Sequence, residues 1–376
     1  MAYERSGASL NADLLRVLIL PSAKVELQLS FLKGVFLVSR HKAGWYFRLS
    51  SFFKERFGDR VYKIPVHAGF TCPNRDGSIS QKGCVFCYNP GFSPPAYEER
   101  SSGKGLTVKE QVRHYQIKLE KVNVKRAPGK TDKKDNYYKN ERDGASSSFD
   151  VPQKKYLAYF QSYSNTYAPL TKLQDLYEEA LSLPGIIGLS IATRPDCLNE
   201  KTINLLEGYA KNRHIWLELG LQSAHDQTLN LINRGHTFEQ FAEATHKVAG
   251  RGINVCAHII NGLPGEDRSH MLKTAVLLNN LPVQGIKFHQ LQVVKNTLLE
   301  NWYNEKKISL LSREEYLEIV CEQLEILNEN VVVHRLLSEV FDKNLLIAPH
   351  WEIFRGSFSQ MVEKELLRRN THQGIK

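Results

Sequence analysis

The stretch VYKIPVHAGFTCPNRDGSISQKGCVFCYNP, residues 61–90, decides how the chain is interpreted. It begins with an apolar run from Val61 to Phe70, which predicts a buried strand. A loop rich in glycine and proline follows, from Thr71 to Pro95, and it carries the pattern C-x11-C-x2-C at Cys72, Cys84 and Cys87. Two thiolates separated by two residues reach one metal centre from a single turn, and a third returns after the eleven-residue excursion. The stretch therefore predicts a metal centre directly after a strand.

The three cysteines allow two kinds of centre. Three thiolates would leave one iron of a four-iron cubane open to a substrate amine and carboxylate, and Gly77 and Gly83 would supply the backbone angles that the wrap needs. The alternative is a zinc site with His67 as fourth ligand, in an adaptor for RNA or protein. Zinc ribbons usually pair one Cys-x2-Cys with a second one, and this sequence has a single Cys-x2-Cys. The pattern therefore favours the iron–sulfur centre.

Five more short apolar runs follow, and amphipathic helical patterns separate them. The runs are Tyr156 to Phe160, Ile186 to Ala192, Ile215 to Leu221, Asn254 to Ile260 and Ile286 to Val294. Strands that alternate with helices predict right-handed βαβ units and a parallel sheet that curls toward a barrel. We therefore expect an α/β fold, a partial (β/α)6 TIM-like barrel, with its chemistry at the carboxyl ends of the strands.

Four helices are expected to begin with a capping box, in which each side chain satisfies a free backbone N–H at the helix start. The pairs are Thr107 with Glu110, Thr171 with Gln174, Thr237 with Gln240, and Ser312 with Glu315. In the helix at Thr171, apolar residues repeat at helical spacing and predict one buried face. They are Leu170, Leu173, Tyr177, Ala180 and Leu181.

The chain is expected to divide into three regions. Residues 1–43 form an N-terminal extension that is possibly mobile, residues 44–310 form the core barrel, and residues 311–376 form a small α+β extension packed on it. Trp45 to Phe57 predicts a lead-in helix. The extension should hold strands at Val331 to Val333 and Leu345 to Pro349, and a final helix from about Ser359 to Arg369.

The composition favours an anionic partner. The 376 residues carry a formal charge of +10 with a sequence pI near 9.1, which favours nucleic acid among such partners. From Lys121 to Arg142 there are eight Lys or Arg against three Asp or Glu. We interpret residues 121–153 as a solvated, flexible insertion; an arm that grips phosphates is the alternative.

Cysteine usage and hydropathy bear on the compartment. The six cysteines form no disulfide framework, and no run of eighteen apolar residues predicts a membrane span. A reducing compartment such as the cytoplasm is therefore expected. Residues 1–43 are also compatible with an organellar transit peptide, although Glu4, Asp13 and Glu26 are more acidic than such peptides usually carry.

Together with four further stretches, the cysteine loop resembles the radical S-adenosylmethionine (SAM) superfamily. The stretches are YFQSYSNTY at 159–167, ATRPD at 192–196, LELGLQS at 217–223 and HIINGLPGE at 258–266. The commonest spacing of that superfamily is C-x3-C-x2-C. The longer first gap is similar to a subgroup that includes the catalytic subunit of Elongator and a set of bacterial and organellar relatives.

The resemblance implies the cofactors and their ligands. Cys72, Cys84 and Cys87 would hold a 4Fe–4S cluster, and SAM bound at the open iron would be cleaved reductively to a 5'-deoxyadenosyl radical. An electron donor of the flavodoxin or ferredoxin type would supply the electron.

Several residues of the matching stretches become candidates for binding SAM. Phe86 would lie beside the adenine, or serve in packing, and Arg194 could hold the SAM carboxylate. Glu218 and Gln222 could hydrogen-bond the ribose or the methionine amine, with a structural ion pair between Glu218 and Arg194 as the alternative. Gly262, with Gly265, would let the backbone approach the adenine. Gln161 and Glu266 complete the candidates from these stretches.

Other polar residues near the strand ends have ordinary structural interpretations. His67, His258 and His289 are expected as core histidines, and His236 as a residue of a helix start. Tyr163 and Tyr167 follow the second strand, where substrate should enter, although a packing role is equally compatible with their positions.

The leading functional hypothesis is a radical SAM enzyme that modifies a tRNA base, by resemblance the wobble uridine. The basic charge and aromatic loops that could stack an unpaired base agree with it. The chain has no room for the acetyltransferase domain of Elongator, so the same overall reaction is not assumed. A radical enzyme on a small molecule, such as a tetrapyrrole or an amino acid, and the zinc adaptor are the alternatives.

Overall fold

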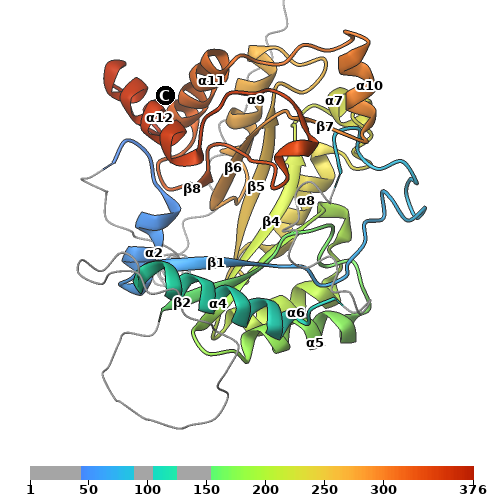
Figure 1. Cartoon of the computed structure of the whole chain (residues 1–376), viewed down its shortest axis with the longest axis vertical. Coiled ribbons are helices and arrows are strands. Elements are labelled where there is room, and N and C mark those ends of the chain that lie inside the picture. Colours follow the sequence, from blue (N-terminus) through green and yellow to red (C-terminus); the bar gives the residue numbers. More distant parts are fainter. Residues whose placement is uncertain (1–43, 89–104, 125–153) are drawn as a thin grey trace, which may run out of the picture. The chain divides into compact units, whose positions relative to one another are not determined.

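Seven parallel strands form a curled sheet, a half-barrel, at the centre of the protein (Figure 1). The computed structural model describes residues 44–88, 105–124 and 154–376. Along the sheet the order is β1-β2-β3-β4-β5-β6-β8, so neighbours in the sheet follow one another in the chain. The strands are β1 (Val61–Val66), β2 (Lys155–Phe160), β3 (Ile186–Thr193), β4 (His214–Gln222), β5 (Ile253–Asn261), β6 (Gly285–Gln290) and β8 (Val332–Arg335). The α/β half-barrel that the alternating pattern predicted is confirmed.

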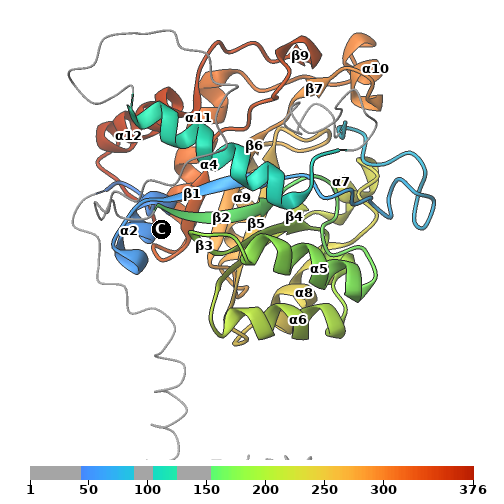
Figure 2. The same ribbon diagram turned by 60° about the horizontal axis from the view of Figure 1, so that its bottom comes forward.

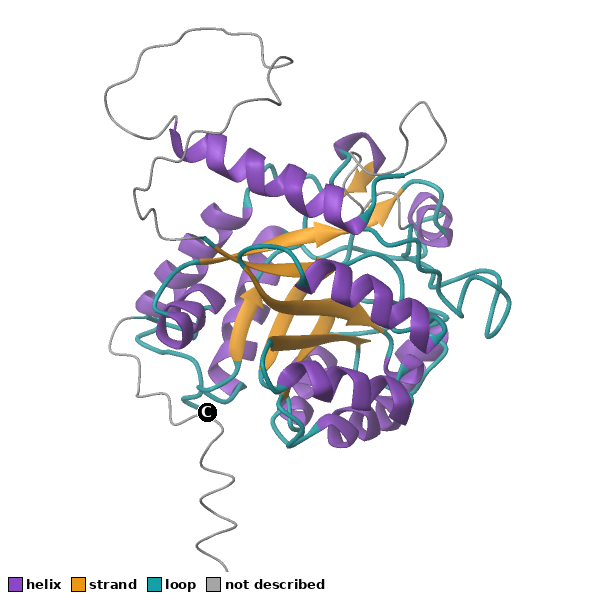
Figure 3. Cartoon of the chain, turned by 90° about the horizontal axis from the view of Figure 1, so that it is seen from below, coloured by secondary structure: helices purple, strands orange, loops and turns teal. Residues whose placement is uncertain are grey.

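Helices cover the outside of this sheet (Figures 2 and 3). They are α2 (Leu49–Phe57), α4 (Val108–Val124), α5 (Leu170–Leu181), α6 (Glu200–Ala210), α7 (Asp226–Leu231), α8 (Phe238–Val248), α9 (Arg268–Leu278), α10 (Leu298–Asn304), α11 (Arg313–Ile326) and α12 (Arg355–Arg368), with short 3-10 turns at Pro195–Cys197 and Lys343–Leu345. On α5 the predicted stripe is buried except for Leu170, which is 38% exposed. Among the described helices, none is long and apolar enough to cross a membrane.

The seventh strand comes from the part of the chain that we expected in a C-terminal extension. β8 lies beside β6, where Gly285 pairs with Val332 and Ile286 with Val333. The predicted run from Ile286 to Val294 is in fact two strands, because β6 ends at Gln290 and β7 (Val293–Val294) pairs antiparallel with β9 (Leu346–Ala348). Hydrophobicity alone predicted strands at both places but not their partners.

Some of the predicted segments outside the strands are present in the structure, and others lie outside the described residues. Residues 1–43 lie outside the described residues, as do 125–153 of the basic insertion, whose first four residues complete α4. Residues 89–104, which include the end of the cysteine loop, also lie outside them. The predicted lead-in helix is present as α2, and the final helix is present as α12.

Three of the four predicted capping boxes are present. Thr237 with Gln240 and Ser312 with Glu315 exchange both bonds, and Thr107 and Glu110 do so at 2.9 and 3.2 Å. The pair at Thr171 is wrong, because α5 begins at Leu170 directly after Pro169 and Gln174 bonds Glu178 instead. Since proline is favoured at helix starts, Pro169 was the better signal.

Aromatic side chains fill the amino-terminal end of the sheet. Phe52 of α2 lies 5.6 Å from the rings of both His214 and Trp216, between ring centroids. On the other side, His334 of β8 contacts the Trp216 ring edge-on at 4.2 Å. The lead-in helix therefore closes one end of the half-barrel and leaves the carboxyl ends of the strands for the site.

The interior of the half-barrel holds a buried carboxylate instead of an apolar layer. Glu218 of β4 is fully buried. Its oxygens accept from Lys63 Nζ of β1 at 2.6 Å and from Ser190 Oγ of β3 at 2.6 Å. From the other side, the imidazole of His258 lies at 2.9 Å, and Lys287 of β6 forms an ion pair with the same carboxylate.

These neighbours keep Glu218 ionised. Burial by itself would raise the pKa of Glu218, but the charges of Lys287 and Lys63 and the hydrogen bond from His258 hold it well below its usual range. Burial, reinforced by Lys63 and partly offset by Glu218, lowers the pKa of Lys287 to about 7. The stability contributed by the Glu218 carboxylate is therefore present at neutral pH and is lost as the pH falls through its depressed pKa.

We expect Glu218→Gln to lower the free energy of unfolding by about 3–5 kcal/mol, because it leaves Lys63 and Lys287 as buried charges without a counter-charge. Urea unfolding at pH 7, followed by circular dichroism, measures the loss. The double variant Glu218→Gln/Lys287→Met removes one of the two opposing charges and should regain part of it. Wild-type stability of the single variant would show that the carboxylate does not hold the strands together.

Candidate active site

One cavity at the carboxyl ends of the strands collects most of the predicted site residues. It has a volume of about 230 Å³, far above the ~10–15 Å³ that one water molecule occupies on this measure. Its lining includes the predicted residues Cys72, Cys84, Phe86, Cys87, Gln161, Arg194, Glu218 and Gln222. Gly262 and Glu266 do not belong to the lining.

The cysteine loop is held in place by the turn between α7 and α8. Asn74 donates to the carbonyl of Asn233 at 2.7 Å, and the Asn233 side chain donates to the carbonyl of Gly83 at 2.6 Å. A backbone bond of 3.1 Å from Val85 to Ile232 continues the same contact. The loop that carries the cysteines therefore takes its shape from residues about 150 positions further along the chain.

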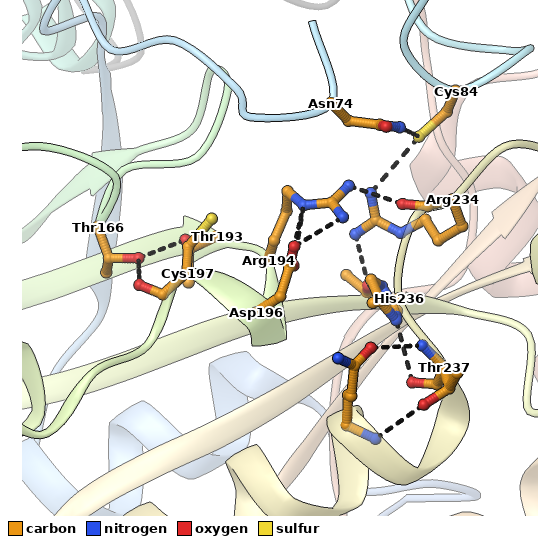
Figure 4. A network of polar contacts seen from close by, with 12 residues as sticks. Asn74, Cys84, Thr166, Thr193, Arg194, Asp196, Cys197, Arg234, His236 and Thr237 are labelled. Carbon is orange, nitrogen blue, oxygen red and sulfur yellow. Dashed lines mark hydrogen bonds and ion pairs between the residues drawn. The ribbon is translucent and has the colours of Figure 1, made fainter. Parts of the chain in front are cut away.

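Two N–H donors point at the sulfur of Cys84 (Figure 4). Asn74 Nδ2 lies 3.5 Å and Arg234 Nη1 lies 3.6 Å from Cys84 Sγ. Arg234 is anchored by its Nη2, which donates to the carbonyl of Gly220 at 2.6 Å. Such donors stabilise negative charge on a thiolate sulfur and tune the potential of a cluster that it binds.

The guanidinium of Arg194 lies beside that of Arg234 and pairs with Asp196 (Figure 4). Its Nε lies 2.9 Å from Asp196 Oδ1 and its Nη2 lies 2.9 Å from Oδ2, while Nη1 donates to the carbonyl of Arg234 at 2.8 Å. The alternative of an ion pair between Glu218 and Arg194 is wrong, since each has other partners. Arg194 supports the turn that holds the cysteine loop; a contact with the SAM carboxylate stays a prediction.

The thiols influence one another electrostatically. Burial and the charges of Cys84 and Cys72, partly offset by Arg75, raise the pKa of the Cys87 thiol to about 11. Arg75 also donates to the carbonyl of Cys87. Binding to a metal deprotonates a thiol outright, so this crowding of three thiols is relieved when each binds iron.

The arrangement does not suit a single metal ion. Within the described part of the chain, no group of three or more His, Cys, Asp and Glu side chains is placed to hold one ion. His67, the fourth ligand of the zinc alternative, does not line the cavity and lies beside the Tyr163 ring, at 6.3 Å between centroids. The three thiolates of a cubane each bind a different iron, so they need not converge on one point. The geometry therefore argues against the zinc adaptor.

Two lining residues have positive φ angles, which residues other than glycine rarely adopt. Tyr163, just after β2, has φ of +66°, and Gln222, at the end of β4, has φ of +78°. The pairing of β4 with β5 also shifts register between Gly220 and Gln222. Conformations of this kind are concentrated at functional sites, and here they turn the two side chains toward the cavity.

Gly262 and Glu266 lie beside the site. The N–H of Gly262, whose φ is +86°, contacts Met271 Sδ at 3.2 Å, and a Cβ at this position would lie 3.1 Å from Leu311. Glu266 accepts a hydrogen bond from Ser223, and burial raises the pKa of this carboxyl group. Their predicted contacts with SAM stay predictions.

Some of the remaining candidates line the cavity, and others contact only neighbouring residues of the protein. His258, His289 and Tyr163 line the cavity. His236 precedes Thr237, the N-cap of α8, and its Nε2 lies 3.1 Å from the carbonyl of Gly220. Burial, with the charge of Arg234, lowers the pKa of His236 to about 2, so it is neutral. Tyr167 lies outside the lining, with its hydroxyl 2.8 Å from that of Ser78.

Sequence reasoning missed the polar residues that support the site. Asn74, Asn233, Arg234 and the two lysines at Glu218 carry no motif in the sequence. The available signal was a lysine inside an apolar run, Lys63 in β1 and Lys287 in β6, because a charge there needs a buried partner.

Two family models match the chain. The radical SAM superfamily model matches residues 145–278, and the model of the radical SAM C-terminal domain matches residues 283–368. The first range begins after the cysteine loop, so the role of the cysteines rests on the geometry of the cavity.

Two bacterial proteins match most of the chain. YtqA of Bacillus subtilis is 36% identical over 88% of this chain and 92% of its own length. YhcC of Escherichia coli is 35% identical over 79% of this chain and 84% of its own length.

More distant similarities reach a tRNA uridine(34) acetyltransferase and a solved structure of Elp3. A tRNA uridine(34) acetyltransferase of Dehalococcoides mccartyi is 33% identical over 32% of this chain and 26% of its own length. The solved structure of Elp3 from Methanocaldococcus infernus, with an N-terminal deletion, aligns with a TM-score of 0.57 at 17% identity, over 83% of this chain and 64% of that one, and shows the same fold.

Members of the superfamily use a 4Fe–4S cluster and SAM. The half-barrel, the three cysteines on its cavity, the two family models and the long bacterial matches agree, and the chain belongs to the radical SAM superfamily.

Proposed function

We propose that the protein cleaves SAM reductively at a 4Fe–4S cluster held by Cys72, Cys84 and Cys87 and uses this chemistry to modify a base of tRNA, the wobble uridine by analogy with its distant relatives. The observation that carries the first part is that all three cysteines line one cavity together with polar side chains from β4 and from the segments that follow β2 and β3. When bound, the cluster and SAM supply a reactive organic radical.

The residues present fit these cofactors. The thiols lie on one wall of the cavity, and two N–H donors point at Cys84. Gln161 and Gln222 line the same space and offer amide groups to the polar parts of SAM, while Phe86 offers a ring to its adenine. Arg194 and Arg234 fix the backbone behind the loop, so these side chains keep their positions as substrate enters.

The tRNA substrate is supported by three further observations. The formal charge of +10 favours a polyanion. Aromatic side chains, Tyr163 and the 42%-exposed Phe341, stand among the cavity residues and could stack an extruded base. The local match to tRNA uridine(34) acetyltransferases adds an analogy, although it spans about a quarter of those proteins. A radical reaction on a small molecule is the alternative.

The proposal needs an electron donor of low potential, of the flavodoxin or ferredoxin type, and a reducing compartment such as the cytoplasm.

After anaerobic reconstitution with iron and sulfide, we expect the wild type to hold about four irons per chain and to form 5'-deoxyadenosine with SAM and dithionite. Cys84→Ala/Cys87→Ala should lose the visible absorbance and the product, because two of three ligands are gone. Cys321→Ala is the matched control, since Cys321 is buried between α11 and α12, next to the carbonyl of Val362. A colourless wild type that retains zinc would contradict the cluster.

We expect tRNA from cells that lack the protein to stimulate 5'-deoxyadenosine formation and to acquire a nucleoside mass change that the double cysteine variant does not produce. Stimulation should weaken as salt rises, because phosphate contacts release counterions. Liquid chromatography with mass spectrometry of digested tRNA gives the readout. If tRNA has no effect while a metabolite filtrate stimulates turnover, the small-molecule alternative holds.

A further inference from the structure

The cavity is also lined by charged residues that the proposed cofactor chemistry does not use. The cysteine loop follows β1, the first strand in the sheet order, whereas Arg335 ends β8, the last strand. Arg355 opens α12, and His289 lies on β6. All three line the cavity. In Figure 1 the red segment between β8 and α12 crosses the end of the sheet.

Positive charge exceeds negative charge around Arg335 and Arg355. Arg335, Arg355, Lys287 and Lys63 face two carboxylates, Glu218 and Glu339. Glu218 is occupied by the two lysines, and Glu339 pairs with Arg355 Nε at 2.8 Å. Within the described residues, the guanidinium of Arg335 has neither an ion pair nor a hydrogen bond. Formally, one guanidinium and one lysine remain without a counter-charge.

The neighbouring groups respond to this excess. Burial and the charge of Arg335 lower the pKa of His289 well below its usual range, and the same two causes lower the pKa of Arg355 to about 10. Burial, with Lys287 and Arg335 beside it, lowers the pKa of His258 to about 4. Burial and the neighbouring positive charge thus disfavour the protonated forms of His289, His258 and Arg355.

His289 provides an independent sign that a ligand group is absent. Its Nε2 is buried and has no hydrogen-bond partner. Buried polar atoms in native proteins nearly always have a partner. The residue stands on the cavity wall beside Arg335, so a group that entered this space could contact both.

We propose that Arg335, Arg355 and His289 form a subsite for an anionic group of the substrate, a carboxylate or a phosphate. The guanidinium of Arg335 presents two parallel N–H donors to two oxygens of such a group, which is the geometry that carboxylates and phosphates accept. Arg355 adds charge, and neutral His289 donates or accepts one hydrogen bond according to its tautomer. This inference rests on the proposed function only for which molecule carries the anionic group. The binding of a carboxylate or phosphate at Arg335 does not depend on it.

The position of the subsite selects substrates by charge. It shares one cavity with the cysteines, so a substrate anchored here would keep its remaining part in the space that the thiols also line. A neutral analogue would leave the cations unpaired and would bind more weakly. The subsite thus acts as both an anchor and a discriminator.

The test is direct binding to the reconstituted, SAM-loaded protein by isothermal titration calorimetry at constant ionic strength. Two matched pairs of probes separate the sources of the anion: uracil-5-carboxylate with uracil, and uridine 5'-monophosphate with uridine. We expect one anion to bind the wild type about ten- to a hundredfold more tightly than its neutral partner. The pair that shows the preference identifies the anion as carboxylate or phosphate.

The variants are Arg335→Gln and Arg335→Lys, with Arg313→Gln as the matched control. Arg313 is an exposed arginine that pairs with Glu314 at the surface. We expect the preference for the anion to disappear in Arg335→Gln, to survive in part in Arg335→Lys, and to stay unchanged in the control. Circular dichroism and iron content verify that each variant is folded and loaded.

Two results would overturn the subsite: no preference for either anion in the wild type, or an unchanged preference in Arg335→Gln. Neither depends on tRNA. If tRNA does not stimulate the protein but an anion is preferred through Arg335, the proposed tRNA substrate is wrong and the subsite stands. If tRNA is modified but no anion is preferred, the subsite is wrong and the proposed substrate stands.

Discussion

The carboxylate of Glu218 is the interaction on which the arrangement of the sheet depends. Lys63, Ser190, His258 and Lys287 bring β1, β3, β5 and β6 to this one group on β4. His334 of β8 lies 3.9 Å away and also contacts Lys63 at 3.4 Å. The first and last strands of an open sheet share no ladder of hydrogen bonds, so a common polar partner in the interior sets the distance between them. Barrel interiors are usually filled with branched apolar residues; the charged interior is tolerated here because the buried carboxylate has two lysines and two hydrogen-bond donors around it.

The same strand links this interior to the cysteine loop. Gly220 lies two residues beyond Glu218 on β4, and its carbonyl accepts from Arg234, which also donates toward Cys84. A Cβ at Gly220 would lie 2.6 Å from Arg234 Nη2, so only glycine leaves room for this contact. Two steps along one strand thus connect the buried carboxylate with the thiols. A change in the curl of the sheet would move the donors that face Cys84.

How far the sequence predicted this structure depends on how local each feature is. The first five strands, most of the stripe on α5 and the capping boxes at Thr237 and Ser312 follow from spacing within a few residues, and they were predicted correctly. The position of the cysteine loop after β1 follows from a pattern that is continuous in the chain, and its binding of a cluster stays a prediction. The pairing of β8 with β6, the partners of Arg194 and the contacts of Asn233 join residues far apart in the chain, and a single sequence contains no signal of such distances. Glu218 was singled out by resemblance, yet its partners on five strands could be seen only in three dimensions.

The hydrogen-bond and ion-pair partners of the cavity arginines distinguish those that support the protein's own loops from one that is available to bind a ligand. Arg75, Arg194 and Arg234 lie beside the cysteines, and each donates to a carbonyl or a carboxylate of the protein. Their charges are already used to shape the loop, in a region where three thiolates would add negative charge. The half-buried Arg335, on the last strand, has no such partner within the described residues, although withdrawing an unpaired cation from water is costly. A side chain that only supported the fold would have been stabilised by a nearby carboxylate, as Arg355 is by Glu339. The unpaired guanidinium is therefore best explained by a partner that arrives with the substrate.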